Sequence, residues 1–193
     1  AAEVTGRMKA MADDRQREVL MRFFKTAPGE YGEGDEFLGI RVPQTRRVVA
    51  EAADMPLKET EELIYSPWHE IRLCGFLILT EHMRRLTMRR ALNDRESMEK
   101  RENLVKYYLS HARQANNWDL VDLSAGKIVG MWLTTPSIAT EQEKTEVIDR
   151  LAESTCLWEQ RIAMVSTIEP TRQGDFRYVL RYAEKLKKHP HDL

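Results

Sequence analysis

The chain has 193 residues, of which 32% are charged and 42% are hydrophobic, and its formal net charge is −1. This length suffices for one domain with a sizeable core, and glycine and proline are too scarce for a loop-rich all-β protein. A near-neutral charge indicates no class of partner, although so many charged residues can form one-sided patches. There is no apolar run of membrane-spanning length and no signal-peptide core, so we expect a cytoplasmic protein that binds no membrane.

Nearly every segment has apolar residues at intervals of three and four, which predicts an all-α protein. In chain order the predicted helices are 13–25, 43–54, 57–65, 67–84, 94–113, 118–133, 141–153, 156–168 and 176–188. Pro43 opens the second of them, because a first-turn proline loses no helix hydrogen bond. Segment 27–38, APGEYGEGDEFL, matches neither GxGxxG nor Walker A, and its acidic residues would repel phosphate. We therefore predict a loop there rather than a nucleotide site.

Two cysteines, Cys74 and Cys156, lie within apolar helical patterns and have no CxxC spacing. This pattern predicts small buried thiols in a reducing compartment rather than a disulfide or a zinc site. The stretch HEIRL at 69–73 lacks the second histidine of HExxH. We therefore predict neither a bound metal nor a cofactor.

Three predicted helices share a weak internal repeat. Segments 66–79 (SPWHEIRLCGFLIL), 116–129 (NNWDLVDLSAGKIV) and 154–167 (STCLWEQRIAMVST) align without gaps when Arg72, Asp122 and Arg161 share a column. Their separation of roughly 40–50 residues is typical of helix-pair repeats, which bury their faces only by stacking on their neighbours. We predict a HEAT-like α-α superhelix, a solenoid of antiparallel helix pairs that forms a single domain over residues 1–193.

The shared column places charges where helices are usually apolar. On a helical wheel Asp122 lies at the edge of an apolar arc, one turn after Trp118, and apolar residues surround Arg161 and Arg72. A buried unpaired charge costs several kcal/mol, so these groups need a partner in each other, in a backbone carbonyl or in a bound molecule. Asp119 lies elsewhere on the wheel and is explained by the first-turn dipole, with Asn117 as the N-cap.

Two interpretations of Asp122 stay open at this point. Stacked repeats often contain a ladder of Asp and Arg, which would make Asp122 and Arg161 a structural pair. Alternatively, Trp118 and Asp122 line the concave wall, where an aromatic face beside a carboxylate suits a cation or a sugar-like transition state. The basic groups of the chain also have two interpretations: they are solvated faces or, if they lie on one concave side, they contact a phosphate backbone. These groups are RVPQTRR, with Arg41, Arg46 and Arg47, RRLTMRR and the C-terminal RYAEKLKK.

Four motifs together resemble one family. With YGEGDEFLGIRVPQTRR, SPWHEIRLCGFLIL, NNWDLVDLSA and LWEQRIA in this order, the chain resembles the AlkD-like DNA alkylation repair proteins from about Met21 onward. The resemblance implies a HEAT-like fold whose basic concave face holds double-stranded DNA and a glycosylase that removes cationic N3- and N7-alkylated purines. It further implies that this chain lacks C-terminal repeats of the family, because a second groove tryptophan belongs to a helix of GWxLRE type that does not occur here.

Matching the motifs residue by residue places the catalytic aspartate of the family at Asp122, its groove tryptophan at Trp118 and its groove arginine at Arg161. Phe23 matches a position where some members have tyrosine, and we expect Phe23, Arg41, Arg46 and Arg47 to contact DNA. An alkylated purine already carries positive charge and leaves as a neutral base, so no general acid is needed. The implied role of Asp122 is to stabilise the oxocarbenium-like sugar and its attacking water, while Trp118 packs against the sugar and Arg161 binds phosphate or orients Asp122. We expect a monomer; the alternative function is a non-catalytic HEAT-like scaffold that binds DNA or protein.

Overall fold

The structure, a computed structural model, describes residues 1–191. Within this range it contains helices and no strand, and its one isolated β-bridge joins Glu36 to Trp68. The predicted all-α fold class is therefore confirmed. Contacts divide the chain into two units, Ala1–His82 and Met83–Leu193, with the boundary inside helix α5 (His69–Leu86). No helix among the described residues is long and apolar enough to cross a membrane.

The first unit contains α1 (Ala2–Lys9), α2 (Asp14–Phe23), α3 (Val42–Glu51), α4 (Leu57–Ile64) and most of α5. The predicted helices agree with α2 to α5 to within a few residues at each end. The sequence did not predict α1, because Val4 and Met8 are the only apolar residues that this short helix buries. Its contact with α3 therefore stabilises it more than its own pattern does.

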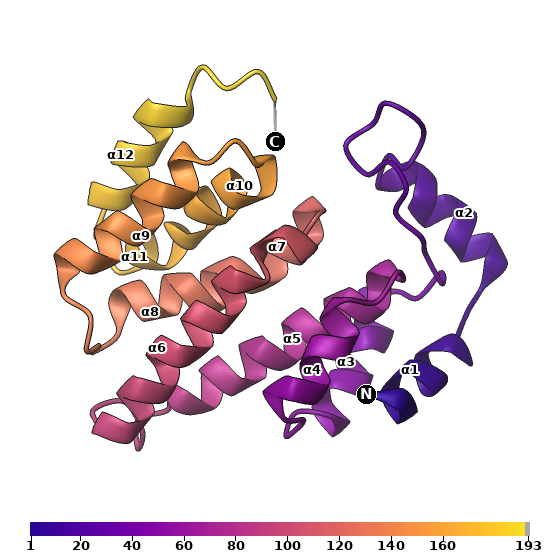
Figure 1. The fold of residues 1–193 in the computed structure, drawn as a ribbon, viewed down its shortest axis with the longest axis horizontal. Coiled ribbons are helices and arrows are strands. Elements are labelled where there is room, and N and C mark those ends of the chain that lie inside the picture. The colour runs from indigo at the N-terminus through magenta and orange to yellow at the C-terminus, as the bar shows by residue number, and fades with distance from the viewer. Residues whose placement is uncertain (192–193) are drawn as a thin grey trace. The chain divides into compact units, whose positions relative to one another are not determined.

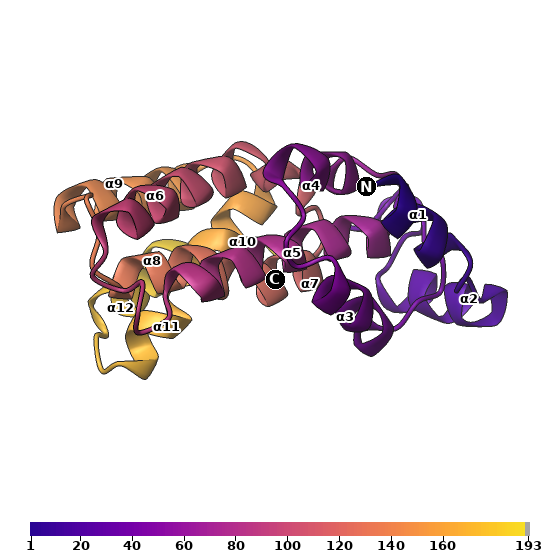
Figure 2. The ribbon, with the colours of Figure 1, turned by 90° about the horizontal axis from the view of Figure 1, so that it is seen from below.

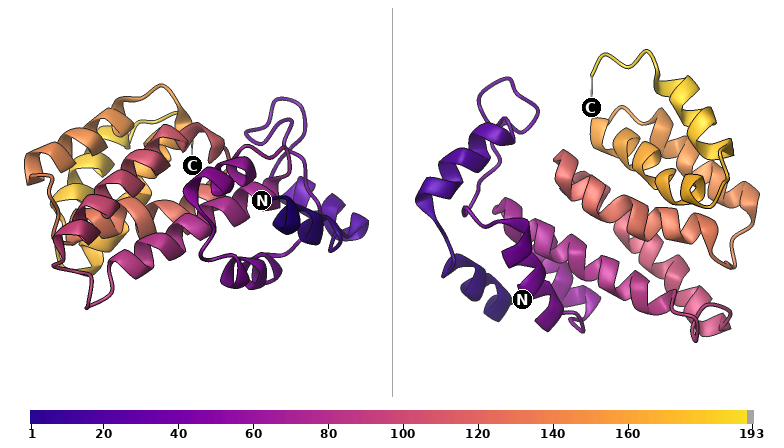
Figure 3. Two further views of the ribbon diagram at one scale, coloured as in Figure 1. Left: turned by 60° about the horizontal axis from the view of Figure 1, so that its bottom comes forward. Right: turned by 180° about the vertical axis from the view of Figure 1, so that it is seen from behind.

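The segment between α2 and α3 is a loop, as predicted, and Figure 3 (right) shows it as a ribbon without helix after the indigo helices. It returns to the start of α2, where the Asp13 N–H donates to the Leu38 carbonyl at 2.9 Å. Gly39 has φ of 86°, and a Cβ at this position would lie 2.1 Å from the Asp13 carbonyl oxygen. Both the backbone conformation and the close approach therefore require glycine.

A buried carboxylate holds the end of this loop. Glu70, in the first turn of α5, accepts hydrogen bonds from the N–H groups of Leu38, Gly39 and Ile40 at 2.8, 2.8 and 3.0 Å. Three successive N–H donors to one charged acceptor form a strong cluster, and they leave none of these buried amides unsatisfied. Glu70 thus fixes the chain immediately before α3, the helix that carries Arg46 and Arg47.

A second buried carboxylate, Asp35, lies in the same loop. His69 Nδ1 is 2.8 Å from Asp35 Oδ2, and Arg72 pairs with Asp35 Oδ1. The Arg72 guanidinium also donates to the carbonyls of Ser66 and Pro67, each at 2.9 Å. Burial alone would raise the pKa of Asp35, but the hydrogen bond and charge of His69, together with Arg72, hold this pKa below its usual value.

Because the pKa of Asp35 is depressed in the folded state, its ionised form stabilises the protein above the unfolded pKa of about 4. We expect the free energy of unfolding to fall as the pH drops below about 5 and this carboxylate is protonated. In urea titrations across this range, Asp35→Asn should show a flatter acid dependence than the wild type. Asp14→Asn, at a side chain 88% exposed, is the control and should retain the wild-type dependence. Equal acid slopes in all three proteins would contradict the assignment.

The second unit is built from pairs of helices. Its elements are α6 (Arg95–Ser110), η1 (Ala112–Gln114), α7 (Trp118–Ala125), η2 (Gly126–Gly130), α8 (Met131–Thr134), α9 (Glu141–Glu153), α10 (Leu157–Ser166), α11 (Ile168–Arg172) and α12 (Arg177–Leu186). Figure 1 shows α7 and α8 returning antiparallel to α6, and Figure 2 shows α6 and α9 in one layer with α8 and α10 in the other. This is the helix-pair arrangement of an α-α superhelix, as predicted.

Two predicted helices of this unit differ from the structure in detail. The segment predicted as one helix over 118–133 contains a π-helical turn, η2, bounded by Gly126 and Gly130. The helix predicted over 156–168 ends at Ser166, and the short α11 follows. Pro170 has no N–H to donate to the carbonyl of Ser166, four residues earlier, so the hydrogen-bond ladder is interrupted there.

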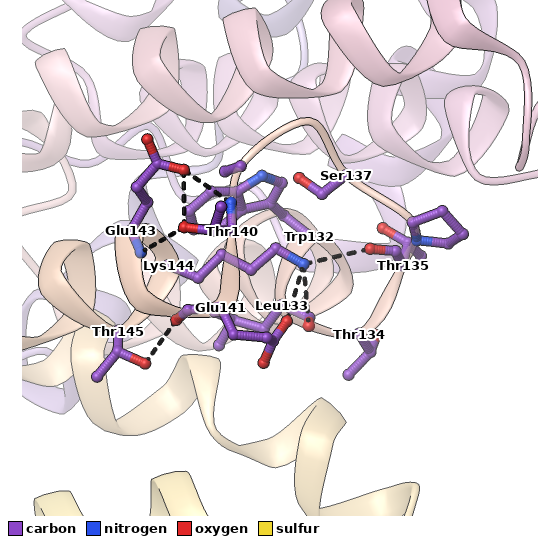
Figure 4. Close-up of polar contacts among 12 residues, drawn as sticks. Trp132, Leu133, Thr134, Thr135, Ser137, Thr140, Glu141, Glu143, Lys144 and Thr145 are labelled. Carbon is purple, nitrogen blue, oxygen red and sulfur yellow. Dashed lines mark hydrogen bonds and ion pairs between the residues drawn. The ribbon is translucent and has the colours of Figure 1, made fainter.

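Two buried cations, Arg101 and Lys144, hold the connections that follow α5 and α8. The Arg101 guanidinium donates to four backbone carbonyls, those of Leu86, Ala91, Leu92 and Pro136. Figure 4 shows Lys144 Nζ bonded to the carbonyl oxygens of Leu133 and Thr135. The nitrogen lies 3.4 and 3.3 Å from these two oxygens and 5.7 Å from the centre of the Trp132 ring. Burial lowers the pKa of Lys144. These contacts satisfy carbonyl groups at and beyond the ends of helices, where no N–H group of the helix can donate to them.

Candidate functional site

Helix α7 carries Trp118 and Asp122, the two residues for which the sequence left a place in a concave wall as one of two interpretations. Its N-cap is Asn117, as predicted, and the Asn117 side chain accepts a hydrogen bond from the Trp118 N–H at 2.9 Å. Trp118 is half-buried, and the Asp122 side chain is 34% exposed. Since residues four apart lie on one face of an α-helix, the indole and the carboxylate are neighbours on the surface of α7.

Asp122 pairs with Arg161 of α10. Arg161 Nε donates to Asp122 Oδ1 at 2.9 Å and Nη2 donates to Oδ2 at 2.8 Å. This two-bond geometry is that of a strong, oriented arginine–carboxylate pair. Of the interpretations that the sequence left open, the structure shows the one in which Asp122 and Arg161 are partners of each other. The Arg161 side chain is only 18% exposed, so the guanidinium is the more buried half of the pair.

The pairing leaves part of the Asp122 carboxylate accessible. Each carboxylate oxygen has two lone pairs, and the guanidinium occupies one on each oxygen. No other hydrogen bond reaches Asp122 among the described residues. With a third of its side chain exposed, Asp122 is therefore an oriented anion that can still interact with a cation or a water molecule from solution.

Arg161 also lines a cavity of about 270 Å³ between α10 and the chain that follows α12. The polar lining comes from Gln160 and Arg161 on α10 and from Lys187, His189 and His191. Polar side chains therefore gather next to the guanidinium of the pair, with Leu157, Met164, Ala183 and Leu186 as the apolar part of the lining. Lys187 itself pairs with Glu184.

Near Asp122, a hydrogen bond between two buried neutral side chains joins α6 to α7. The Tyr108 hydroxyl of α6 lies 2.9 Å from Ser124 Oγ of α7, and both side chains are buried. Burial raises the pKa of Tyr108, and the nearby charge of Asp122 raises it further. Tyr108 therefore stays protonated at neutral pH and fixes α7 against α6.

The sequence predicted the position of Asp119 in the first turn of α7 but not that its side chain is buried. It lies in the first turn, as the dipole argument predicted, and its carboxylate accepts a hydrogen bond from the Leu120 N–H at 2.9 Å. Its burial was not predicted, because position on a helical wheel relative to one apolar arc does not reveal which other helices cover it.

The predicted DNA contacts of the first unit are accessible. Phe23 is 61% exposed at the end of α2. Arg41 Nε and Nη2 donate to Gln16 Oε1 at 3.0 and 2.7 Å, whereas Arg46 and Arg47 are exposed and have no carboxylate partner among the described residues. These residues belong to the first unit and the Asp122–Arg161 pair to the second, so their joint action on one DNA duplex stays a prediction.

The C-terminal basic group is largely paired within the protein. Arg181 of α12 donates to Asp149 of α9 at 3.0 and 2.6 Å, and Lys185 Nζ lies 2.5 Å from Glu153 Oε1. Lys187 of the same run pairs with Glu184. The predicted phosphate contacts of this group are therefore reduced, because three of its cations already have carboxylate partners. In the same way Arg72, which shares the column of Asp122, pairs with Asp35 inside the first unit.

The two cysteines are free. Cys74 is buried, as predicted, and burial raises the pKa of its thiol to about 12. Cys156 is only half-buried, because it is the N-cap residue of α10 rather than an interior residue of that helix. Among the described residues, no group of three or more His, Cys, Asp or Glu side chains is arranged to hold a metal ion.

Comparison with known proteins adds one finding to this geometry. The family model described as DNA alkylation repair enzyme matches residues 4–193. Searches among curated proteins and among solved structures produced no match. Since the family model covers nearly the whole chain, this protein belongs to the family of DNA alkylation repair enzymes.

Proposed function

We propose that this protein is a DNA glycosylase that hydrolyses the N-glycosidic bond of positively charged N3- and N7-alkylated purines in double-stranded DNA. The observation that carries the proposal is the Asp122 carboxylate, which Arg161 orients by two hydrogen bonds and which remains exposed one turn from Trp118. Membership of the DNA alkylation repair family supports a DNA substrate.

The chemistry requires few groups. When the bond between C1′ and the purine nitrogen breaks, its electron pair leaves with the base and neutralises the charge that alkylation placed there. Positive charge then develops on the deoxyribose, water adds to C1′, and the proton of that water passes to Asp122 or to solvent. Asp122 stabilises the developing cation, and one preorganised charge of this kind accelerates a reaction by roughly 10²–10³.

The two neighbours of Asp122 have supporting roles. Trp118 offers an aromatic face to the sugar, and its π electrons also favour a developing positive charge. Arg161 holds the carboxylate plane in one orientation, and we assign the phosphate next to the lesion to the cavity that Arg161 lines with Gln160 and His189. In this arrangement Arg161 need not release Asp122, because each carboxylate oxygen keeps one lone pair that the guanidinium does not occupy.

The alternative is a non-catalytic scaffold that binds DNA or protein. The observation that favours it is the same ion pair, since an Asp–Arg contact between stacked helices is also a structural device. Under this alternative the protein binds duplexes without releasing any base.

The discriminating experiment compares a cationic with a neutral lesion. The protein is incubated with duplexes that carry either 7-methylguanine or uracil at one position, and released base is measured by chromatography. We expect 7-methylguanine to be released at least about tenfold faster than its spontaneous loss, and uracil not at all, because uracil would need help in leaving as an anion. Release of neither base from a duplex that the protein binds would establish the scaffold alternative. Release of uracil would contradict the mechanism without a general acid.

A further inference from the structure

The helix that carries Asp122 contacts α10 through one stripe of residues at four-residue spacing. Asp122, Gly126 and Gly130 follow one another at this spacing, so they lie on the same side of α7 and η2. Asp122 meets Arg161 of α10, and both glycines face backbone carbonyl groups near the end of that helix. The ion pair and the two glycines therefore belong to one helix–helix contact.

The approach is closest at Gly130. A Cβ built on Gly130 would lie 2.9 Å from the carbonyl oxygen of Ser166 and 3.1 Å from Glu169 Cβ. Ordinary contacts between carbon and a carbonyl oxygen are about 3.3–3.6 Å. A methyl group at Gly130 would therefore push the backbone of α10 away by about half an ångström, because a backbone carbonyl cannot move aside as a side chain can.

The contact at Gly126 is looser. A Cβ there would lie 3.4 Å from the Val165 carbonyl oxygen and 4.0 Å from Val165 Cγ1, which are ordinary van der Waals distances. Gly126 and Gly130 thus share a helix, a π-helical turn and a facing helix, and they differ in how much space a side chain would find.

We propose that Gly130 is a positioning residue that sets the separation of α7 and α10 and so keeps Arg161 within two hydrogen bonds of Asp122. Arg161 precedes Ser166 by five residues, about 7.5 Å along the helix, so a shift of α10 at Ser166 is transmitted to the guanidinium. The two nitrogen–oxygen distances are 2.9 and 2.8 Å, and a displacement of about half an ångström lengthens at least one of them beyond the 2.7–2.9 Å of a strong charged hydrogen bond and so weakens the pair. The catalytic part of this proposal rests on the proposed function.

The first experiment measures the ion pair without using activity. The coupling free energy between Asp122→Asn and Arg161→Gln is obtained from a double-mutant cycle by urea unfolding in three backgrounds: the wild-type protein, Gly130→Ala and Gly126→Ala. We expect the coupling to fall by at least half with Gly130→Ala and to remain unchanged with Gly126→Ala. Equal coupling in all three backgrounds would overturn the proposal, whether or not the protein is a glycosylase.

The second experiment measures single-turnover excision of 7-methylguanine at saturating protein. Gly130→Ala should reduce the rate at least about fivefold with little change in duplex affinity, whereas Gly126→Ala should stay within about twofold of the wild type. In an Arg161→Gln background Gly130→Ala should cause no further loss, because the pair through which it acts is already absent. A further loss of the same size would show a general structural effect and overturn the proposal.

Folding is checked for each variant by circular dichroism before either measurement. If Gly130→Ala does not fold, Gly126→Val replaces it, because a branched side chain at Gly126 meets Val165 one turn from the ion pair. We then expect the same loss of coupling and rate with Gly126→Val, and wild-type values would overturn the proposal. If the wild-type protein excises no base, the proposed function fails, while the coupling experiment still decides the role of Gly130.

Discussion

Asp122→Asn is expected to slow single-turnover excision of 7-methylguanine by at least about tenfold, and by up to about 10³, while duplex affinity changes little. The substitution keeps the shape of the side chain and removes its negative charge. The lost interaction strengthens only as positive charge develops on the sugar, so the effect falls on the rate rather than on binding. The measurement is the rate of base release at saturating protein, together with the dissociation constant for the same duplex.

The chain offers a closely matched control in Asp149. Its carboxylate also accepts two hydrogen bonds from an arginine of a neighbouring helix, Arg181, at 3.0 and 2.6 Å, and its side chain is 22% exposed against 34% for Asp122. Both pairs are partly exposed, so Asp122→Asn and Asp149→Asn should each reduce the free energy of unfolding by only about 1 kcal/mol. If Asp122 had a purely structural role, the two variants would retain similar excision rates. A folded Asp122→Asn protein that excises at the wild-type rate would refute the catalytic role.

Glu70→Gln is expected to produce the largest loss of stability, about 2–4 kcal/mol in the free energy of unfolding. Glu70 accepts three buried N–H groups on its two oxygens, and glutamine replaces one of these oxygens with an NH₂ group that faces a donor. At least one buried amide is then left unsatisfied, and the charge that strengthened the other bonds is lost. Urea unfolding monitored by circular dichroism measures the effect.

Glu62→Gln in α4 is the control for this substitution, because Glu62 is exposed and makes no such contacts. We expect its free energy of unfolding to stay within about 0.5 kcal/mol of the wild type. The structure predicts a further consequence for Glu70→Gln. Since Glu70 fixes the chain before α3, amide hydrogen exchange of Leu38 and Ile40 should accelerate more than that of the core of α5. Unchanged exchange at these amides would show that the loop has another support.

Some site residues could be predicted because they follow a local pattern. The helical period placed Trp118 and Asp122 on one face of α7, and the repeat aligned Asp122 with Arg161, which is its partner in the structure. Asn117 was predicted as the N-cap because capping depends on residues adjacent in the chain. The loop at 27–38 followed from its composition in the same way.

Partners across helices were harder to predict. Arg72 has the same column position as Asp122 and Arg161, yet its carboxylate partner is Asp35, from a loop that the repeat does not include. Arg181 and Lys185 belong to a basic run that suggested phosphate binding, and only the packing of α12 on α9 shows that Asp149 and Glu153 pair with them. The charge of a side chain is visible in the sequence, whereas the group opposite it depends on the rotation and spacing of two helices.

The sequence by itself determined the all-α class, most helix boundaries and the column that contains Asp122 and Arg161, because the 3.6-residue period and the repeat are properties of the chain alone. Only the tertiary structure decided that this carboxylate is paired and still exposed, that Glu70 holds the loop before α3, and that Gly130 touches the backbone of α10. The physical reason is that these contacts depend on the separation of elements distant in sequence, and a change of a few tenths of an ångström in that separation alters them. Such separations result from the packing of the whole core, and no local pattern encodes them.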